Sequence, residues 1–295
     1  MRRAVDWVDA FSAHPFGGNG CAVVHDAADL DSERCCAFVR ETSLVECTFV
    51  EPPSDASVDV KVRYFLASHE IPFAGHPTVA TAASLWDRGI LTRSPMRFET
   101  GAGIIIVDVS ETDSGPVFTM TQAGPQFGPT ADPAAVAEIY GLSASDVVGV
   151  PQVVSTGLGF TITVLSSREA LERAVMDHDL LRAHCAKLGA PDGTMLEPYL
   201  ITLNGATDAG DTFGRLLMLP PSPAEDPFTG SATGAAAAYL WKHGMIDSPN
   251  YVAEQGHGMG RPGQAQVEIV GSEGAPELIR VGGQGHILMS GELRL

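Results

Sequence analysis

The chain has 295 residues, of which 44% are hydrophobic, and it carries 18 Lys and Arg residues against 36 Asp and Glu residues, a formal net charge of -18. Because this charge repels phosphate backbones and anionic lipid surfaces, nucleic acids and membranes are not expected as partners. The length predicts a compact protein with one large core or two medium ones.

The cysteines and the N-terminal residues bear on the cellular compartment. Five cysteines, an odd number without Cys-x-x-Cys spacing, argue against a disulfide framework or a zinc site. Asp6 and Asp9 stand where a signal peptide needs an apolar run, and no run of about 18 apolar residues occurs. We therefore expect a cytoplasmic protein.

The first part of the chain reads as short strands with few helices between them. Helices are expected over residues 27–40 and 78–88, where apolar residues recur at helical spacing. Residues 122–133 contain three prolines and two glycines and form the best candidate linker. Apolar runs predict strands over residues 4–11, 20–25, 44–50, 58–66, 103–109 and 117–121.

The same mixture of elements returns after the linker. Helices are expected over residues 133–140 and 233–243. Strands are expected over residues 159–165, 199–203, 266–270, 278–281 and 286–291. Many short strands with few helices indicate the α+β class.

An internal repeat at an offset of 155 residues indicates the architecture. Residues 70–90 read EIPFAGHPTVATAASLWDRGI and residues 225–245 read EDPFTGSATGAAAAYLWKHGM, with 11 of 21 positions identical. Each copy reads as a strand, a tight turn at a glycine, and a helix that ends at Gly89 or Gly244.

The repeat predicts two pseudosymmetric halves, each a curled mixed or antiparallel sheet around a central helix. The first half is expected over residues 1–124 with its central helix at 77–89. The second is expected over residues 125–295 with its central helix at 232–244, and its last strand can return to the first half.

The starts of the two central helices are expected to form a binding site. His76 is predicted at the N-cap of the first, before Pro77, and Ser231 at the N-cap of the second. Two such halves would face each other with both helix N-termini across one cleft. Their unpaired N–H groups and partial positive charge suit an anionic small molecule such as a carboxylate. The alternative is a duplicated fold whose capping residues only stabilise it.

The differences between the two copies fall on chemically active residue types. His76 stands opposite Ser231, and Asp226 stands opposite Ile71. A neutral histidine at a helix N-terminus can accept or donate a proton near pH 7. Each residue also has a structural explanation: His76 as a cap or core residue, Asp226 as a turn initiator, and Ser231 as an N-cap.

Glu46 is the fourth candidate. In the strand expected over residues 44–50 both faces are largely apolar, so the carboxyl group is expected to be desolvated. Desolvation would raise its pKa toward the range of a general acid or base. The structural alternative is an edge strand with Glu46 in water.

Other catalytic motifs are missing from the sequence. There is no HExxH motif, no P-loop and no Gly-x-Ser-x-Gly elbow, and the glycines of residues 256–263 and 282–285 do not follow a strand as a dinucleotide-binding fingerprint requires. These glycines indicate tight turns. Arg261 beside them is a candidate to reach a substrate carboxylate.

Five segments together resemble the signature blocks of the PhzF-like family, and they span Val8 to Gly263: VDAFSAHPFGGNGCAVV, ETSLVECTFV, EIPFAGHPT, AEDPFTGSATGAAAAYL and EQGHGMGRPG. The resemblance implies the diaminopimelate-epimerase-like fold, commonly assembled as a homodimer. It also implies isomerisation of trans-2,3-dihydro-3-hydroxyanthranilate in phenazine biosynthesis, without a metal or an organic cofactor.

The resemblance also implies roles for single residues. The proton shuttle falls on Glu46, the proton relay on His76, and the partner of a substrate ammonium group or proton on Asp226. Substrate binding falls on Ser231, and the further candidates for substrate binding from the same blocks are Asn19, Gly75, Thr229 and Gly230.

Two segments depart from the family pattern. Residues 17–20 replace a block that is usually closer to FGNPVAVV, and residues 65–68 differ from the common Thr-Pro or similar. Both flank the expected cleft, so they leave the substrate open. Related racemases and epimerases place a cysteine at each helix N-terminus, where this chain has His76 and Ser231, which argues against that chemistry.

The sequence therefore predicts an isomerase in which Glu46 removes a C–H proton from a small cyclic amino acid carrying a carboxylate and returns it elsewhere on the conjugated system. One alternative is an isomerase or C–C hydrolase acting on proline-like or dihydropyrrole intermediates of antibiotic biosynthesis. Another is a non-catalytic protein that binds an acidic metabolite.

Overall fold

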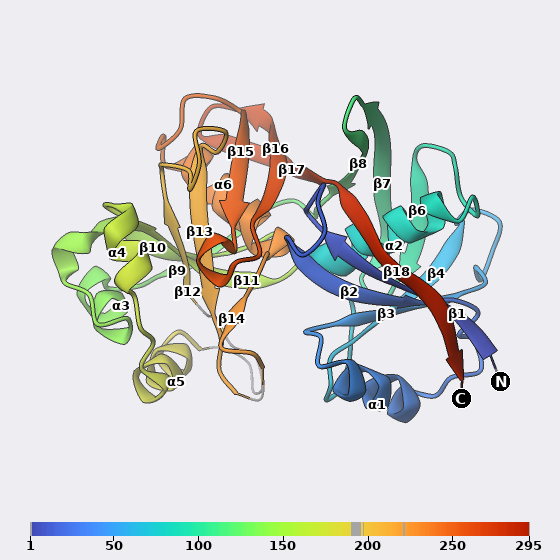
Figure 1. Cartoon of the computed structure of the whole chain (residues 1–295). Helices are drawn as coiled ribbons and strands as arrows, with labels where there is room; N and C mark the ends of the chain where they lie inside the picture. Colours follow the sequence, from blue (N-terminus) through green and yellow to red (C-terminus); the bar gives the residue numbers. More distant parts are fainter. Residues whose placement is uncertain (1, 190–195, 197, 221, 295) are drawn as a thin grey trace. The chain divides into compact units, whose positions relative to one another are not determined.

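The computed structural model describes residues 2–189, 196, 198–220 and 222–294. The chain divides into two compact units, Met1–Thr121 together with Val281–Leu295, and Gln122–Arg280. The chain therefore leaves the first unit once and returns to it once. The first unit contains both ends of the chain, which lie close together in Figure 1 because its first strand pairs antiparallel with its last, Arg2 opposite Arg294.

The first unit combines a mixed sheet with an outer and a central helix (Figure 1). The two helices are α1 (Ser32–Thr42) and α2 (Gly75–Asp87). The strands are β1 (Arg2–Ala10), β2 (Asn19–Val24), β3 (Cys47–Glu51), β4 (Val60–Phe65), β5 (Glu70–Ile71), β6 (Met96–Thr100), β7 (Gly103–Thr112), β8 (Gly115–Thr121) and β18 (Gly285–Arg294).

The strands of the first unit pair in the order β18–β1–β2–β3–β4–β6–β7–β8. The pairs β2–β3 and β4–β6 are parallel and the others are antiparallel. The short strand β5 pairs with β4 and leads directly into α2.

In the described part of the second unit, the helices are α3 (Pro133–Ile139), α4 (Arg168–Arg173), α5 (His178–Lys187) and α6 (Gly230–Lys242). Two short 3-10 turns lie at Ala144–Asp146 and His257–Met259. Its strands are β9 (Gln126–Thr130), β10 (Val147–Ser155), β11 (Gly159–Leu165), β12 (Pro198–Thr202), β13 (Thr212–Leu217), β14 (Glu225–Asp226), β15 (Asn250–Gln255), β16 (Gly263–Ser272) and β17 (Ala275–Gly283), whose last residues belong to the first unit.

The pairing order of the first unit recurs in the second. The strands pair in the order β9–β10–β11–β12–β13–β15–β16, with β11–β12 and β13–β15 parallel. The short strand β14 pairs with β13 and leads into α6, as β5 pairs with β4 and leads into α2. The sequence repeat is thus a repeat of topology.

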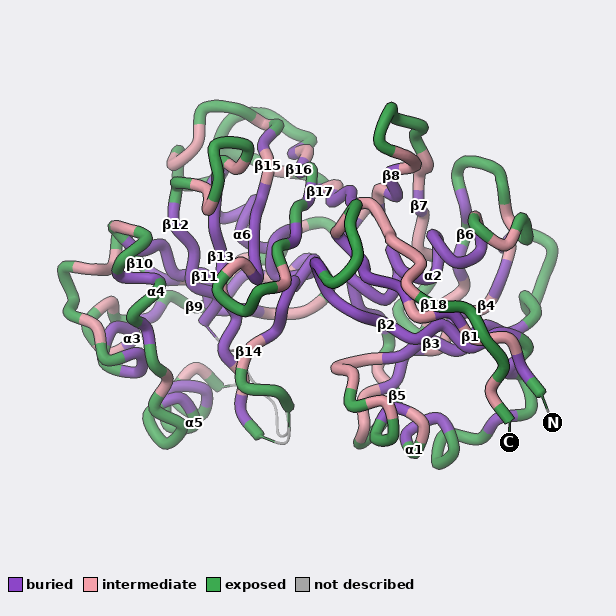
Figure 2. Tube along the Cα trace, in the orientation of Figure 1, coloured by how far each residue is buried: buried purple, intermediate pink, exposed green. Residues whose placement is uncertain are grey.

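The two central helices are wrapped by the sheets of their own units. Helix α2 contacts β1, β2, β3, β8 and β18, and its residues from Gly75 to Leu85 are all buried. Helix α6 contacts β10, β11, β12 and β16, and it is buried from Gly230 to Trp241. Burial along the whole trace is drawn in Figure 2, where buried segments follow the strands and central helices of each unit. The small alanine side chains of both helices allow strands to approach on every side.

The remaining helices cover other apolar surface. Helix α1 packs Cys35, Cys36 and Val39 into a cluster with residues of β2, β3 and β4. Helices α3, α4 and α5 pack into a second cluster with residues of β11, β12 and β13. Each unit therefore buries apolar residues both against its central helix and beneath its outer helices.

The glycine stops are confirmed, and the N-caps are not. Gly89 and Gly244 follow the two helices with φ of 65° and 60°, a left-handed conformation that glycine adopts without strain. The N-caps, however, are Ala74 and Thr229, so His76 and Ser231 are the second residues of their helices.

Two further predictions need correction. Helix α1 begins at Ser32 rather than at residue 27, because Asp31 caps it by accepting a hydrogen bond from the backbone N–H of Arg34. Glu46 does not lie within a strand, since β3 begins at Cys47.

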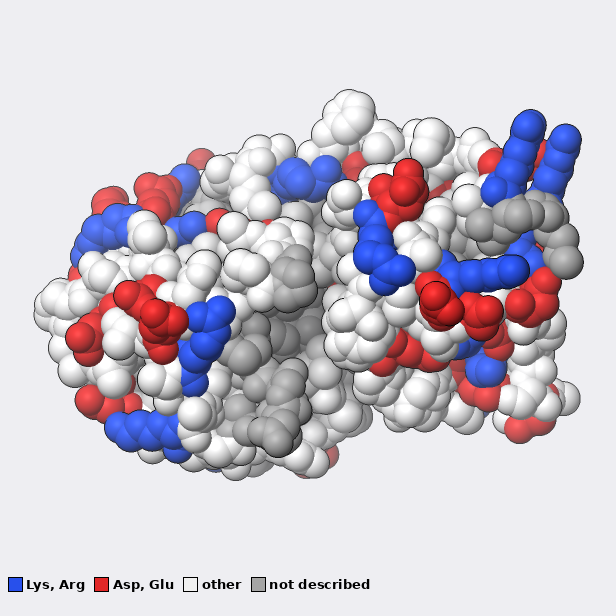
Figure 3. Space-filling model, turned by 90° about the horizontal axis from the view of Figure 1, so that it is seen from below, with Lys and Arg blue, Asp and Glu red and all other residues white. Residues whose placement is uncertain are grey.

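The surface carries charges of both signs. On the face shown in Figure 3, Lys and Arg side chains lie among Asp and Glu side chains on both units. Among the described residues, no helix has the length and apolarity that a membrane crossing needs.

Candidate active site

Three of the predicted site residues meet in the first unit. His76 Nδ1 lies 3.5 Å from the Glu46 carboxylate oxygen Oε2 and 3.1 Å from the Asn19 amide nitrogen. Asn19 and His76 are buried, at 2% and 4% exposure, whereas the Glu46 side chain is 15% exposed. The cluster is therefore a carboxylate that solvent reaches only slightly, beside an imidazole held by an amide.

Each of the three residues comes from the edge of a different element. Asn19 is the first residue of β2, Glu46 directly precedes β3, and His76 lies in the first turn of α2. Strands β2 and β3 are parallel neighbours, with Ala22 opposite Cys47, which places their N-terminal ends at the same edge of the sheet. The sheet thus brings together residues that are far apart in the sequence.

Gly18 makes the approach of Asn19 possible. Its φ is +52°, and a Cβ atom there would lie 2.0 Å from the carbonyl oxygen of Ala10. A residue with a side chain would force the backbone to move at this point. The departure from the family pattern at residues 17–20 therefore lies directly beside the cluster.

Helix α2 presents its positive end to this cluster. Its N-cap residue Ala74 makes no side-chain capping bond. The carbonyl of Ala74 accepts a hydrogen bond from Thr78, whose hydroxyl also contacts the Tyr64 hydroxyl at 2.8 Å. The first N–H groups of a helix and its dipole favour an anion at this position.

The orientation of the Asn19 amide depends on whether His76 Nδ1 carries a proton. An amide nitrogen carries two hydrogens and no lone pair that accepts, so its contact with Nδ1 requires an unprotonated Nδ1. A protonated Nδ1 could instead donate to Glu46, with the amide turned to present its oxygen. The cluster can therefore pass between two arrangements that differ by one proton.

Two neighbouring thiols stay protonated. Burial raises the pKa of Cys47 to about 12 and that of Cys21 well above its ordinary value, and the charge of Glu46 adds to both effects. A protonated thiol is a weak base and a weak nucleophile. Glu46 and His76 accordingly remain the candidates for proton transfer in this region.

The predicted residues of the second unit meet at the start of α6. The Thr229 hydroxyl donates to the Asp226 carboxylate, and both residues are buried. Ser231 follows in the first turn of the helix with 6% exposure. The Gly230 carbonyl accepts a hydrogen bond of 2.9 Å from the Gln122 side chain.

Gln255, which the sequence interpretation missed, organises this group. Its side-chain oxygen accepts from the Thr229 backbone N–H and the Tyr199 hydroxyl, both at 3.1 Å. Its side-chain nitrogen donates to the Asp226 carbonyl at 2.8 Å. In the sequence, its only signal is its place in the EQGHGMGRPG segment, where Arg261 is the candidate substrate-binding residue.

The structure thus gives two groups, each at the start of a central helix. The first contains Glu46, His76 and Asn19 beside Gly75, and the second contains Asp226, Thr229, Gly230 and Ser231. That both groups share one cleft stays a prediction. Among the described residues, no group of three or more His, Cys, Asp or Glu side chains is arranged to hold a metal ion.

Comparisons with known proteins identify the family of the chain. Residues 8–291 match the PhzC-PhzF family, described as phenazine biosynthesis-like protein. The chain is 30% identical over 266 residues, covering 88% of each protein, to the uncharacterized isomerase YfhB of Bacillus subtilis. It is also 30% identical over 292 residues, covering 98% of each, to the trans-2,3-dihydro-3-hydroxyanthranilate isomerase of Pseudomonas aeruginosa.

The same family appears among solved structures. A phenazine biosynthesis protein of the PhzF family from Bacillus anthracis superposes with a TM-score of 0.88 at 24% identity, over 100% of both chains. This similarity confirms the predicted α+β fold with two related halves.

Proposed function

Because this chain is an isomerase of the phenazine biosynthesis-like PhzC-PhzF family, we propose that it moves a proton within a small cyclic amino acid that carries a carboxylate. The trans-2,3-dihydro-3-hydroxyanthranilate on which the Pseudomonas aeruginosa relative is named to act belongs to this class. The contact between Glu46 and His76 at the start of α2 is the observation that carries the proposal.

The proposed isomerisation needs one group that first accepts a proton as a base and then donates it as an acid. The Glu46 carboxylate takes a proton from an acidic C–H bond, and the electron pair left behind spreads over the conjugated system of the substrate. The protonated Glu46 then returns that proton to another carbon, so the double bonds shift and nothing is oxidised or reduced. Such a positioned acid–base group accelerates a reaction by about 10² to 10⁴.

His76 and Asn19 keep Glu46 ready for both steps. An imidazole within 3.5 Å of the carboxylate can share its proton, and the Asn19 amide holds the ring in place. In this scheme the chain uses its own side chains throughout, with no metal ion or organic cofactor taking part.

The helix N-termini are the proposed anchors of the substrate. The first N–H groups of α2 and α6, together with the Ser231 hydroxyl, offer donors to a carboxylate. Asp226, beside Thr229, offers a negative charge to the ammonium group of the substrate.

Isotope exchange identifies the substrate. The purified protein is incubated in heavy water with trans-2,3-dihydro-3-hydroxyanthranilate and with a panel of cyclic amino acids, and deuterium is followed by mass spectrometry. We expect that at least one compound with a conjugated ring and a carboxylate is converted to a deuterated isomer.

The alternatives predict other results. Residues 17–20 depart from the family pattern next to His76, so a second candidate is an isomerase or C–C hydrolase acting on proline-like or dihydropyrrole compounds. Turnover of those compounds alone would support it. Tight binding without any exchange would indicate a binding protein and would refute the proposed isomerisation.

A further inference from the structure

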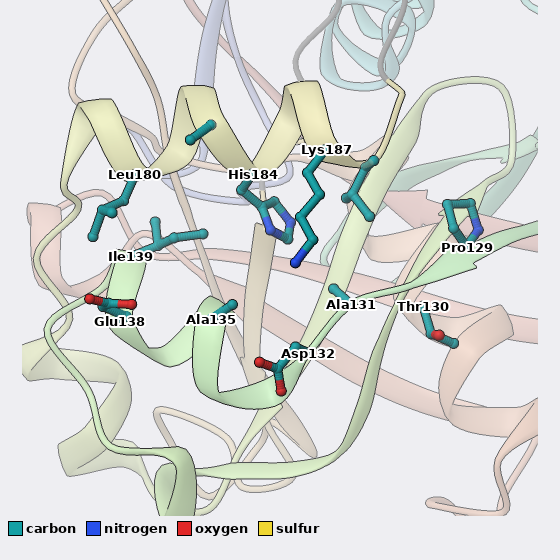
Figure 4. Close-up of a pocket in the computed structure, with 12 residues that line it drawn as sticks. Pro129, Thr130, Ala131, Asp132, Ala135, Glu138, Ile139, Leu180, His184 and Lys187 are labelled. Carbon is teal, nitrogen blue, oxygen red and sulfur yellow. The ribbon is translucent and has the colours of Figure 1, made fainter.

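A cavity of about 450 Å³ lies in the second unit between helices α3 and α5 (Figure 4). Its lining belongs to this unit alone and includes none of the residues assigned above to the candidate active site. Small-molecule sites commonly have volumes of about 300–1,000 Å³. The cavity is therefore large enough for a ligand of its own.

Apolar side chains form much of the lining. Ala135 and Ile139 come from α3, and Leu180, Ala183 and Leu188 come from α5 and the residue after it. Figure 4 shows the side chains of Ile139 and Leu180 directed toward one another at one end. This lining suits the apolar body of a small molecule.

His184 supplies a buried polar atom within the lining. The residue is 8% exposed, and Figure 4 shows its ring projecting from α5 toward α3. Its Nε2 is buried and has no hydrogen-bond partner within the described part of the chain. A buried polar atom of this kind is uncommon in a folded protein, and a ligand could satisfy it.

The protonation state of His184 determines which hydrogen bonds it can make to a ligand. Burial, and then the charge of Lys187, lower its pKa below the ordinary value of 6.5. The ring is therefore neutral at pH 7, with one nitrogen that donates and one that accepts. It can bond to a polar group of a ligand without adding charge to the cavity.

Charges of both signs complete the lining. Lys187 reaches toward the cavity in Figure 4 and makes no ion pair with any residue that the structure describes. Asp132, whose carboxylate accepts from the Ala134 N–H, and Glu138 lie on the side of α3. An anionic ligand would meet two carboxylates, and a cationic ligand would leave Lys187 uncompensated, so a ligand with both charges fits best.

We propose that this cavity binds a small zwitterion with an apolar body, such as a free amino acid with an aromatic or aliphatic side chain. Its carboxylate pairs with Lys187 and contacts His184, its ammonium group faces the carboxylates of α3, and its side chain packs on Ile139 and Leu180. This is a second ligand site, and it stands independently of the proposed isomerisation.

Three probes with the same ring test the proposal by calorimetry on the full chain: L-phenylalanine, 3-phenylpropanoate and 2-phenylethylamine. Phenylalanine is expected to bind most tightly, and to shift the side-chain NMR signals of His184, which the His184→Gln variant assigns.

The variants Lys187→Met and Glu138→Gln are each expected to weaken phenylalanine binding by about fivefold. Arg182→Met, on the same helix but outside the lining, is the control and should bind as the wild type does.

Several results would overturn the proposal. They are an absence of phenylalanine binding, equal binding of either singly charged probe, unchanged affinity in both the Lys187 and Glu138 variants, or His184 signals that do not respond. Lys187 and Glu138 are exposed, so their variants are expected to fold. The affinity measurements therefore remain informative even if the His184→Gln variant does not fold. Because no readout uses isomerase activity, failure here is distinguishable from failure of the proposed function.

Discussion

At the scale of single residues, the proposed proton transfer depends on the contacts among Glu46, His76 and Asn19. One nitrogen of His76 faces both the carboxylate and the amide. When this nitrogen is unprotonated it accepts a hydrogen bond from the Asn19 amide, and when it is protonated it can donate one to Glu46. In the proposed mechanism, Asn19 is therefore a positioning residue that selects between the two proton states of His76.

Asn19→Ala is expected to lower kcat by about 10- to 100-fold with a smaller change in KM, because the imidazole loses its support but the substrate anchors remain. The pH profile of kcat should also shift, which a purely structural role of Asn19 would not cause. Asn204→Ala, at an exposed position of the second unit, is the control. A variant with normal kcat and an unchanged pH profile would remove Asn19 from the mechanism.

The sequence named all three residues of this cluster, but it placed Asn19 in substrate binding and gave no sign of its contact with His76. Glu46 and His76 stood out by residue type and by the signature segments, whereas the role of Asn19 depends on a turn at Gly18 and on the parallel pairing of β2 with β3. Gln255 had no signal beyond its place in a signature segment, because a glutamine near a strand end is ordinary until its four hydrogen-bond contacts are seen.

At the scale of elements, helix α2 is fixed at its far end by a buried charge network. The Asp6 carboxylate accepts from Arg88 and Ser84 near the end of α2 and from Ser290 of β18. His25 also contacts Asp6, at 3.2 Å, and is buried. Removal of one member would leave a buried charge or donor without its partner.

This network makes stability depend on pH. Burial, and then the charge of Arg88, lower the pKa of His25 below its ordinary value of 6.5 in the folded protein. The folded state consequently binds fewer protons than the unfolded state in this range. The contribution of His25 to stability is complete above about pH 6.5 and is lost as the pH falls through its folded-state pKa.

The free energy of unfolding, measured by urea titration, should therefore fall between pH 7 and pH 5. Each unit of pKa difference between the two states accounts for about 1.4 kcal/mol. His25→Gln should make the decline shallower, and His14→Gln, at an exposed position, should leave it unchanged. Equal slopes in wild type and His25→Gln would contradict this explanation.

Element boundaries show where sequence patterns fail. Strand β11 was predicted with its observed limits, Gly159–Leu165, because a run of aromatic, aliphatic and threonine residues that favour strands coincides with a buried strand. The central helices begin earlier than predicted, at Gly75 and Gly230, since histidine and serine were taken as caps. The strand that the repeat predicts before each tight turn is present as β5 and β14, although each has only two residues and is too short to show a period of its own.

At the scale of the whole molecule, the repeat explains why two groups of polar residues exist. Each unit places a short strand before a central helix, and each helix begins beside polar side chains. The two groups differ in chemistry, since one holds a carboxylate with an imidazole and the other a carboxylate with a hydroxyl. Duplication followed by divergence of side chains accounts for this pattern.

A double-mutant cycle tests whether the two units act on one substrate molecule. Glu46→Gln and Asp226→Asn each should lower kcat/KM, and the double variant should lose less than the product of the two single losses. Glu225→Gln, next to Asp226 but paired with Arg215, is the matched control and should show no coupling to Glu46. Losses that multiply independently would refute joint action.

The central claim is that Glu46 carries the proton, and the most direct measurement is the rate of deuterium incorporation from heavy water into the substrate by Glu46→Gln. The account predicts a loss of about 10² to 10⁴ in that rate, while Glu41→Gln, on the exposed side of α1, keeps the wild-type rate. Incorporation by Glu46→Gln at the wild-type rate would contradict the account.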